Sequence, residues 1–552
     1  MATEVQSGRT ETYALSLKPA GYLNVLIPPD ATVLSAKVLG APSTIAWKYL
    51  GVFTLRSYQF AQIGVDDYTP HWPRSSQTAP LSVMIQVSRN TRQYAAASAD
   101  QLSDTVIKRL SQSSVSGTAL PGLSFGNVER ANEWRGSPIL PVNKIQSYQL
   151  TQSNVGYVII TSGNLQSLLS NYVNWKQTQG MLPFLITMET IMAVYAGDTV
   201  QSRTMEFLKD AYNTWHMEYV LFVGGKDTVP PIKYQRTSLE VSGQMLDLTT
   251  DYYYATLEQP TNSYTQTHYR ALDICEPGAV CVTTLNTEYP VDFPDFILGR
   301  LPSDNPTEIA NMLAKTISYE QNQNPGDWVK NSLLVAGAVS GTTSWPVSSW
   351  EQYARGPRTQ LRYPQNLTVN ALVQAINLGV GSVILYTHGD ESEWWLGGQE
   401  TLGYDNVGLL SNTRLPVIFT EGCFTGKWDT SRSVAVKLLA MQNTGAVAII
   451  SGMWYGPQGL EVYYSAYNDY PDYVPNSNYN IGKAFFYLTS LDGVIEYMNV
   501  LGDPSLVLAI SRYPLINAHE FRNVVSILPV VVASAMFQRG YTLTSTRISS
   551  IL

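Results

Sequence analysis

The chain has 552 residues, of which 44% are hydrophobic and only 14% are charged, and its formal net charge is −8. This length exceeds that of one ordinary domain, and the hydrophobic content is sufficient for a large core. No basic tract occurs, which argues against nucleic acid as a partner. The low charge and the 35 tyrosines predict a polar, uncharged surface, which is typical of an extracellular or cell-surface protein.

Residues 1–145 are predicted to form a β-rich domain. Short apolar stretches separated by Pro and Gly turns indicate strands at residues 22–29, 32–39 and 81–87, and a sandwich is the simplest packing for them. Residues 104–145 are rich in Ser and Gly at first and are interpreted as a linker.

The location of the protein stays open on the sequence alone. The chain starts without a charged head followed by an apolar core, so no signal peptide is visible and an intracellular location remains an alternative. No stretch reaches the ~18 apolar residues that a membrane-spanning helix needs, so we expect no spanning segment.

From about residue 150, strand and helix patterns alternate, which predicts a doubly wound parallel sheet with right-handed crossovers. Helices are expected at residues 164–179, before Gly180, and at 203–216. Buried strands are expected at residues 157–161, 184–187, 219–223, 333–338 and 446–450. We divide this part into subdomains 146–325 and 326–510, and leave 511–552 as a short C-terminal extension.

Two apolar stretches end abruptly in polar turns and organise the second subdomain. Residues 382–387 lead into His388, and residues 415–422 lead into Cys423. The helix-sized segment between them suits a βαβ crossover, so both residues should lie at the same carboxyl edge of the sheet, where ligands bind. Either residue alone is usually structural, but a Cys beside an imidazole is a nucleophile with its base.

The pair His388-Gly389 and the segment Cys423-Phe-Thr-Gly-Lys-Trp-Asp429 resemble the gingipain-type cysteine peptidases, which share the caspase-like fold. Further segments resemble this family in the same order, at residues 157–161, 173–180, 218–231, 250–255, 297–302 and 499–505. The resemblance covers about residues 155–510. It implies a caspase-like parallel sheet flanked by helices, preceded by the N-terminal β-rich (sandwich) domain as a prodomain that inhibits the enzyme.

The resemblance implies a cysteine endopeptidase that acts on protein or peptide substrates through a thioester. Cys423 would attack the scissile carbonyl, and His388 would protonate the leaving amine and then activate water. The backbone N–H of Gly389 is a candidate donor to the oxyanion. Asp251 and then Glu421 are the candidates for an acidic residue that orients His388.

Gingipains bind basic P1 side chains, which requires a carboxylate in the pocket. Asp292 and Asp295 lie where a relative places pocket residues. Trp394, Trp395 and Trp454 are candidates for the pocket wall, because Arg and Lys stack on aromatic faces. A position in the core or at the rim is an equal alternative for each tryptophan.

The two other cysteines, Cys275 and Cys281, flank a turn-forming Glu-Pro-Gly-Ala-Val segment. They are predicted to form a disulfide, which would leave Cys423 unpaired as a nucleophile requires. The alternative is that all three cysteines are reduced and unrelated.

Three acidic residues beside His388 are candidates for a structural calcium site, namely Asp390, Glu391 and Glu393. A solvated acidic loop is the alternative. No other cofactor is expected to be required, since no Cys/His set has zinc spacing.

Two alternatives to an endopeptidase stay open. A sortase-like transpeptidase would use the same thioester but transfer it to an amine instead of water. A non-catalytic surface or scaffold protein could use the same fold, because fold does not fix function.

Overall fold

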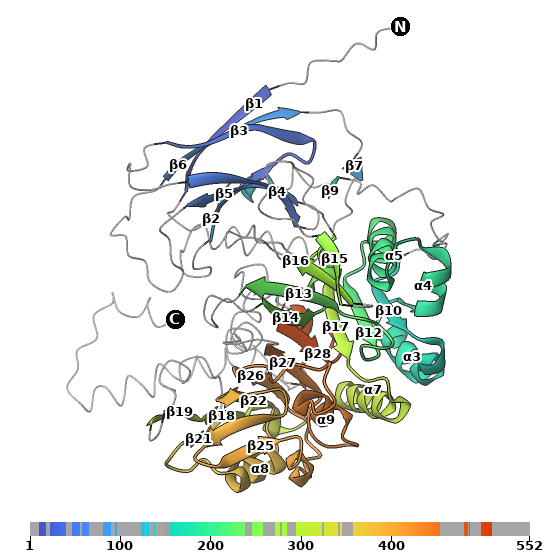
Figure 1. The fold of residues 1–552 in the computed structure, drawn as a ribbon, viewed down its shortest axis with the longest axis vertical. Helices are drawn as coiled ribbons and strands as arrows, with labels where there is room; N and C mark the ends of the chain where they lie inside the picture. Colours follow the sequence, from blue (N-terminus) through green and yellow to red (C-terminus); the bar gives the residue numbers. More distant parts are fainter. Residues whose placement is uncertain are drawn as a thin grey trace, which may run out of the picture.

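The computed structural model describes most of the region from residue 154 to 452, and parts of the chain on either side of it (Figure 1). The described residues are 10–17, 22–39, 47–55, 58–65, 81–89, 94–95, 123–126, 128–131, 137–138, 150, 152, 154–237, 245–257, 271–276, 279–283, 294–322, 325–340, 343–344, 357–452, 480–483, 485 and 498–509.

Two small sheets form the N-terminal region. One contains β1 (Thr10–Leu17), β6 (Leu81–Arg89) and β3 (Ala31–Leu39), and the other contains β4 (Trp47–Leu55), β5 (Tyr58–Val65), β2 (Tyr22–Ile27) and β8 (Leu123–Gly126). Apolar side chains of both sheets share one core, to which Val25, Ile63 and Ile85 belong. The expected β-rich sandwich is therefore confirmed.

Alternate residues of the second sheet face the rest of the molecule. Leu26 and Phe60 are buried in the large core that also contains the strands after residue 154. Val128 and Ala131, at the short 3₁₀ turn η1 (Val128–Arg130), belong to the same core. The N-terminal region is thus packed against the α/β region by apolar side chains.

A ten-stranded sheet forms the centre of the α/β region, as expected for its fold class (Figure 1). Its strand order is β11 (Pro183–Thr187), β10 (Tyr157–Thr161), β12 (Tyr219–Val223), β17 (Ile297–Leu301), β28 (Met498–Leu501), β27 (Ala448–Gly452), β26 (Val417–Thr420), β22 (Ser382–Tyr386), β18 (Ser332–Ala336) and β21 (Arg358–Arg362).

Neighbouring strands of this sheet are parallel everywhere except between β27 and β28, which pair antiparallel. The strands on the two sides of this junction therefore run in opposite directions. The sequence of β28 does not indicate whether this strand runs parallel or antiparallel to its neighbours, because its direction depends on pairing with distant segments. The carboxyl ends of β22 and β26 consequently lie at the opposite edge from those of β10 and β12.

Several of the longer helices begin at side-chain caps. Thr199, Asn305, Thr368 and Ser433 each accept a hydrogen bond from a backbone N–H in the first turn that follows. The helices are α2 (Gly163–Gln166), α3 (Ser170–Thr178), α4 (Met188–Val194), α5 (Val200–Trp215), α6 (Tyr252–Ala255), α7 (Pro306–Gln321), α8 (Val369–Leu378) and α9 (Val434–Ala440), with 3₁₀ turns η2 (Ser167–Leu169), η3 (Asp327–Lys330) and η4 (Val407–Leu409).

The expected helix over 164–179 is therefore α2, η2 and α3 in sequence, and Gly180 follows with a φ of +77°, as a helix-ending glycine should. The remaining strands form hairpins or short sheets: β7 (Tyr94–Ala95), β9 (Ser137–Pro138), β13 (Ile232–Thr237), β14 (Met245–Thr250), β15 (Ala271–Glu276), β16 (Ala279–Thr283), β19 (Ala338–Ser340), β20 (Thr343–Ser344), β23 (His388–Gly389), β24 (Glu393–Gly397) and β25 (Glu400–Gly403).

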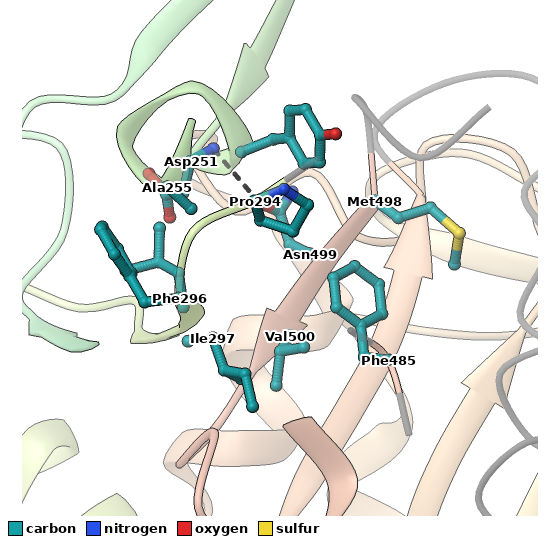
Figure 2. A pocket seen from close by; sticks show the side chains of 12 residues that line it. Asp251, Ala255, Pro294, Phe296, Ile297, Phe485, Met498, Asn499 and Val500 are labelled. Atoms are coloured by element: carbon teal, nitrogen blue, oxygen red, sulfur yellow. Dashed lines mark hydrogen bonds between the residues drawn. The ribbon is translucent and has the colours of Figure 1, made fainter. Parts of the chain in front are cut away.

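A small cavity lies beside the contact between β17 and β28 (Figure 2). Its volume is about 30 Å³, which is enough for a water molecule. Asp251 and Asn499 both line it, and the Asp251 backbone N–H donates to Asn499 Oδ1 at 3.5 Å.

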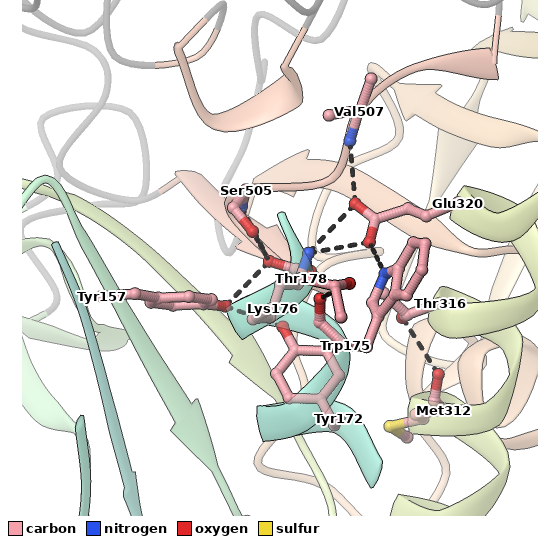
Figure 3. A network of polar contacts seen from close by, with 11 residues as sticks. Tyr157, Tyr172, Trp175, Lys176, Thr178, Met312, Thr316, Glu320, Ser505 and Val507 are labelled. Carbon is pink, nitrogen blue, oxygen red and sulfur yellow. Dashed lines mark hydrogen bonds and ion pairs between the residues drawn. The ribbon is translucent and has the colours of Figure 1, made fainter. Parts of the chain in front are cut away.

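A buried ionic network connects four segments of the chain (Figure 3). Lys176 of α3 forms ion pairs with Glu320 of α7 and with Asp503, which follows β28. Tyr157 of β10 donates to Asp503 Oδ1 at 2.8 Å, and the Trp175 indole donates to Glu320 Oε2 at 2.7 Å. The network therefore holds the segment that follows β28 against helices α3 and α7.

Candidate active site

His388 and Cys423 follow neighbouring parallel strands. In the register of β22 and β26, Leu385 lies opposite Thr420, and His388 and Cys423 each lie three residues further on. The Glu421 backbone N–H also donates to Leu385 O at 2.8 Å, which continues the pairing past the end of β26. The polar residues that follow both strands are thus held at the same edge of the sheet.

The short strand β23 holds His388 through antiparallel pairing with β24. His388 lies opposite Trp395, and Gly389 lies opposite Trp394. The rings of His388 and Trp395 have centroids 6.3 Å apart and are tilted by 49°. The imidazole is half-buried, and the Trp395 side chain beside it is 45% exposed.

Gly389 brings the strand that carries His388 close to the loop that carries Cys423. A Cβ at this position would lie 2.7 Å from Thr425 Cγ2 and 2.8 Å from Glu393 O. Both distances are shorter than real Cβ contacts, so this close approach requires glycine. The role of its N–H as an oxyanion donor stays a prediction.

The Cys423 loop, which we define as residues 422–429, is held by hydrogen bonds to its own subdomain. The Gly422 N–H donates to Thr420 Oγ1 at 3.0 Å, and the Thr425 hydroxyl donates to Gly422 O at 2.8 Å. Gly426 N–H donates to Gly452 O of β27 at 3.0 Å. Cys423 is a half-buried free thiol in this loop.

The two neighbouring tryptophans of β24 have opposite environments. Trp394 is fully buried, and its indole N–H donates to Thr420 Oγ1 at 2.8 Å. It therefore packs beneath the Cys423 loop, which fits the alternative of a core position, and its role in the wall of a substrate pocket stays a prediction. Trp395 is exposed, and its contact with substrate stays a prediction. Trp454 lies outside the described residues.

The two candidate orienting acids have different settings. Asp251 is buried, and its carboxylate accepts two hydrogen bonds from Arg300, at 2.6 Å from Nε to Oδ2 and 2.7 Å from Nη2 to Oδ1. Glu421 is half-buried and precedes Cys423 by two residues. An orienting role for either residue toward His388 stays a prediction.

Of the two candidate pocket acids, only Asp295 lies among the described residues. It is 4% exposed, and its Oδ2 accepts from the Leu257 backbone N–H at 2.8 Å. Its own N–H donates to Ala255 O at 2.7 Å. These contacts join the start of β17 to the end of α6, and a role of Asp295 or Asp292 in substrate binding stays untested.

The acidic cluster beside His388 is organised as a turn. Asp390 Oδ1 accepts from the backbone N–H groups of Ser392 and Glu393, at 2.8 and 3.1 Å, and from the Ser392 hydroxyl at 2.8 Å. Within the described ranges, no group of three or more His, Cys, Asp or Glu side chains could hold a metal ion. A calcium ion at Asp390, Glu391 and Glu393 stays a prediction.

Cys275 and Cys281 lie on β15 and β16, which pair antiparallel as a hairpin. The structure describes the backbone of this hairpin, but the two cysteine side chains lie outside what it describes. The predicted disulfide is therefore untested.

Arg300 and Trp428 were not predicted as site residues, although both lie in segments that carry the family resemblance. Arg300 is 1% exposed, and its guanidinium lies 4.1 Å from the centroid of the Trp428 ring in the Cys423 loop. An arginine inside the otherwise apolar strand Ile297–Leu301 was the available signal, because buried charges are almost always paired.

A mixed sheet flanked by helices thus carries a half-buried cysteine and a half-buried histidine at one edge. Peptidase family C25 matches residues 150–509, and this chain belongs to that family of cysteine peptidases. Its substrates are accordingly proteins or peptides.

A comparison with solved structures gave several matches. The complex of Porphyromonas gingivalis RgpB pro- and mature domains has 20% identity and a TM-score of 0.47, with 64% of this chain and 79% of that chain covered. The Arg specific cysteine proteinase gingipain R (RgpB) has 19% identity and a TM-score of 0.47, with coverages of 66% and 80%. Dimeric latent PorU from Porphyromonas gingivalis has 9% identity and a TM-score of 0.33, with coverages of 93% and 53%.

No curated protein matches the chain. Among the described helices, none is long and apolar enough to cross a membrane.

Proposed function

We propose that this chain is a cysteine endopeptidase in which Cys423 is the nucleophile and His388 is the general acid and base. The observation that carries the proposal is the register of β22 and β26, which brings both residues to one edge of the sheet. The free thiol of Cys423 and the half-buried imidazole support it. Membership of the C25 family supports the reaction class.

The reaction proceeds in two steps. The Cys423 thiolate attacks the scissile carbonyl carbon, and His388 donates a proton to the leaving amine as the peptide C–N bond breaks. The resulting thioester is attacked by a water molecule, from which His388 accepts the proton, and the thiolate leaves. The Gly389 N–H donates to the oxyanion in both steps. The close approach of Gly389 to Thr425 in the Cys423 loop supports this role.

The P1 pocket accepts a basic side chain in this proposal. The exposed Trp395 ring next to His388 offers an aromatic face on which an Arg or Lys side chain can stack. Asp292 and Asp295 are the candidates for the pocket carboxylate in this proposal.

The protein works outside the cell or at its surface in this proposal, which the small charged fraction of the chain supports.

The N-terminal domain inhibits the peptidase until the linker of residues 104–145 is cleaved. The burial of Leu26 and Phe60 in the common core supports a close association of the N-terminal sheets with the peptidase unit.

The direct test is cleavage of a peptide library that is scanned at P1, by the wild type and by Cys423→Ala. Cleavage after Arg or Lys by the wild type alone is the expected result. Cleavage only after acidic or neutral residues would overturn the basic preference while leaving the nucleophile in place. Turnover that appears only when an amine acceptor is added would replace hydrolysis by transpeptidation.

A further inference from the structure

Arg300 is the fourth residue of β17, next to β28, the strand at which the two oppositely directed sets of strands meet. Its neighbours across the sheet are Phe222 on β12 and Leu501 on β28. The guanidinium is held by Asp251 through two hydrogen bonds, and its Nη1 donates to Gly224 O at 2.8 Å and to Val229 O at 3.0 Å. Its orientation is therefore fixed on three sides.

Two aromatic rings contact the guanidinium, Phe222 with its centroid 5.0 Å from Arg300 Cζ and Trp428 at a shorter distance. The distance from Arg300 Cζ to the Trp428 ring centroid is 4.1 Å, and the Trp428 side chain is 3% exposed. A cation over an indole face in a desolvated place is a favourable contact. Trp428 belongs to the Cys423 loop, so a residue of the first subdomain contacts the loop of the second.

A second contact joins the same two parts. The Thr249 hydroxyl of β14 donates to Asp429 Oδ2, and Thr249 is two residues from Asp251. The Arg300 stack and this hydrogen bond both act on the end of the loop, at Trp428 and Asp429. The start of the loop is held by Thr420 of its own subdomain.

The loop contains a strained residue that makes such contacts necessary. Phe424, directly after Cys423, has a φ of +57°, a left-handed conformation that residues other than glycine rarely adopt. Such a conformation persists only where the surroundings determine it. A loop released at Trp428 is expected to relax at Phe424 and so to move the Cys423 thiol.

We propose that Arg300 is a positioning residue of the active site: its buried guanidinium is the platform on which Trp428 stacks, and this stack orients the Cys423 thiol toward His388. The inference rests on the proposed function for the identity of the nucleophile. Arg300 does not act on substrate. It acts through Trp428. Both proposed catalytic side chains come from the second subdomain, and this contact explains why the enzyme also needs the first.

The test uses the full chain, activated if necessary by cleavage of the linker, with Arg300→Lys, Trp428→Leu and Trp428→Phe. Lysine keeps the charge but lacks the planar fork that binds Asp251 and faces the indole. Arg300→Lys and Trp428→Leu are expected to lower kcat by roughly 10- to 100-fold with little change in KM, because small displacements of reacting groups have effects of this size. Trp428→Phe retains an aromatic face and should keep most of the rate.

The rate of alkylation of Cys423 by iodoacetamide, measured across pH, is the second readout. It should change in Arg300→Lys and Trp428→Leu, because the thiol loses its place beside the imidazole. This readout does not need peptidase activity. If the wild type cleaves no peptide, the proposed function fails, but the alkylation profiles still decide whether Arg300 positions Cys423.

The matched control is Lys176→Met, which removes another buried cation that is paired with an aspartate, Asp503. It is expected to lower the melting temperature while leaving kcat and the alkylation profile of the folded protein unchanged. Wild-type kcat and alkylation in folded Arg300→Lys would overturn the proposal. If Arg300→Lys does not fold, a folded Trp428→Leu variant with the wild-type kcat and the wild-type alkylation profile would also overturn the proposal.

Discussion

Gly389 shows how a single residue sets the distance between the two proposed catalytic side chains. It follows His388 directly, and the space that a Cβ would need is taken by the Thr425 methyl group, two residues after Cys423, and by Glu393 O. Any added atom must therefore push the histidine strand and the cysteine loop apart. A side chain at position 389 should therefore lower the stability of the fold and displace His388 relative to Cys423.

We expect Gly389→Ala to lower the free energy of unfolding by about 1–3 kcal/mol, as overpacking does, and to lower kcat more than it changes KM. Urea unfolding and steady-state kinetics measure the two effects. Gly408→Ala is the matched control, because a Cβ there meets no atom within 4 Å and φ lies outside the left-handed region. Equal stability and kcat for both variants would show that the close approach at Gly389 is not required.

At this scale, local patterns predicted some residues and missed others. The position of His388 and Cys423 at one edge of the sheet could be predicted, because each residue closely follows an apolar stretch of strand length. The stack of Arg300 on Trp428 could not, since it joins segments that are distant in the sequence. Trp394 and Trp395 are adjacent and alternate on β24, but the sequence does not indicate which face of that strand is buried.

Among the elements, α7 and α9 are joined by a buried lysine. Lys315 of α7 is 2% exposed, and its ammonium group donates to the backbone carbonyls of Leu438, Thr444 and Ala446 at 2.9 to 3.0 Å. These carbonyls lie in the last turns of α9 and in the segment that leads into β27. Burial lowers the pKa of Lys315 to about 7.

The lowered pKa predicts a dependence of stability on pH. Above pH 7 the folded state has released this proton, whereas the unfolded state keeps it up to a pKa of about 10.4, so raising the pH favours folding. Between pH 7 and 9, the free energy of unfolding of the wild type should therefore rise relative to that of Lys315→Met, by at most about 1.4 kcal/mol per pH unit.

Urea unfolding of both proteins at pH 7, 8 and 9 measures this difference. Lys437→Met, which replaces an exposed lysine on α9, controls for the removal of one positive charge. A difference that does not vary with pH would mean that the three carbonyl groups keep Lys315 protonated throughout.

The prediction of elements was most successful where periodicity is strong and local. The helix expected over 203–216 is α5, extended by its Thr199 cap to Val200–Trp215, and the expected strands 157–161 and 219–223 have the predicted bounds. The direction of β28 was not predictable. An apolar four-residue strand fits either orientation, and only its pairing with β27 and β17 decides between them.

For the whole molecule, the central feature is that two oppositely directed sets of strands form one sheet and meet at β28. A buried contact crosses this junction where Arg300 of β17 reaches Trp428, and the ion pair of Lys176 with Asp503 lies directly after β28. The N-terminal sheets add apolar contacts to the same core. The class of fold followed from the alternating strand and helix patterns, whereas these long-range contacts depend on tertiary structure.

Removal of residues 1–145 tests the proposed inhibition by the N-terminal domain. We expect kcat/KM to rise when the domain is removed by cleavage in the linker of residues 104–145. Thermal unfolding of the remaining chain must accompany the assay, because Leu26 and Phe60 leave the common core with the domain. Equal activity of the intact protein and a folded, truncated protein would contradict an inhibitory role.

The nucleophile is the central claim, and labelling with a thiol-directed peptide ketone under reducing conditions tests it most directly. The protein is labelled with and without its N-terminal domain, and the modified residue is located by mass spectrometry. We predict one adduct per chain, on Cys423, which forms far more slowly in His388→Ala. An unmodified Cys423 in both forms of the protein, or an adduct on Cys275 or Cys281 instead, would contradict the account.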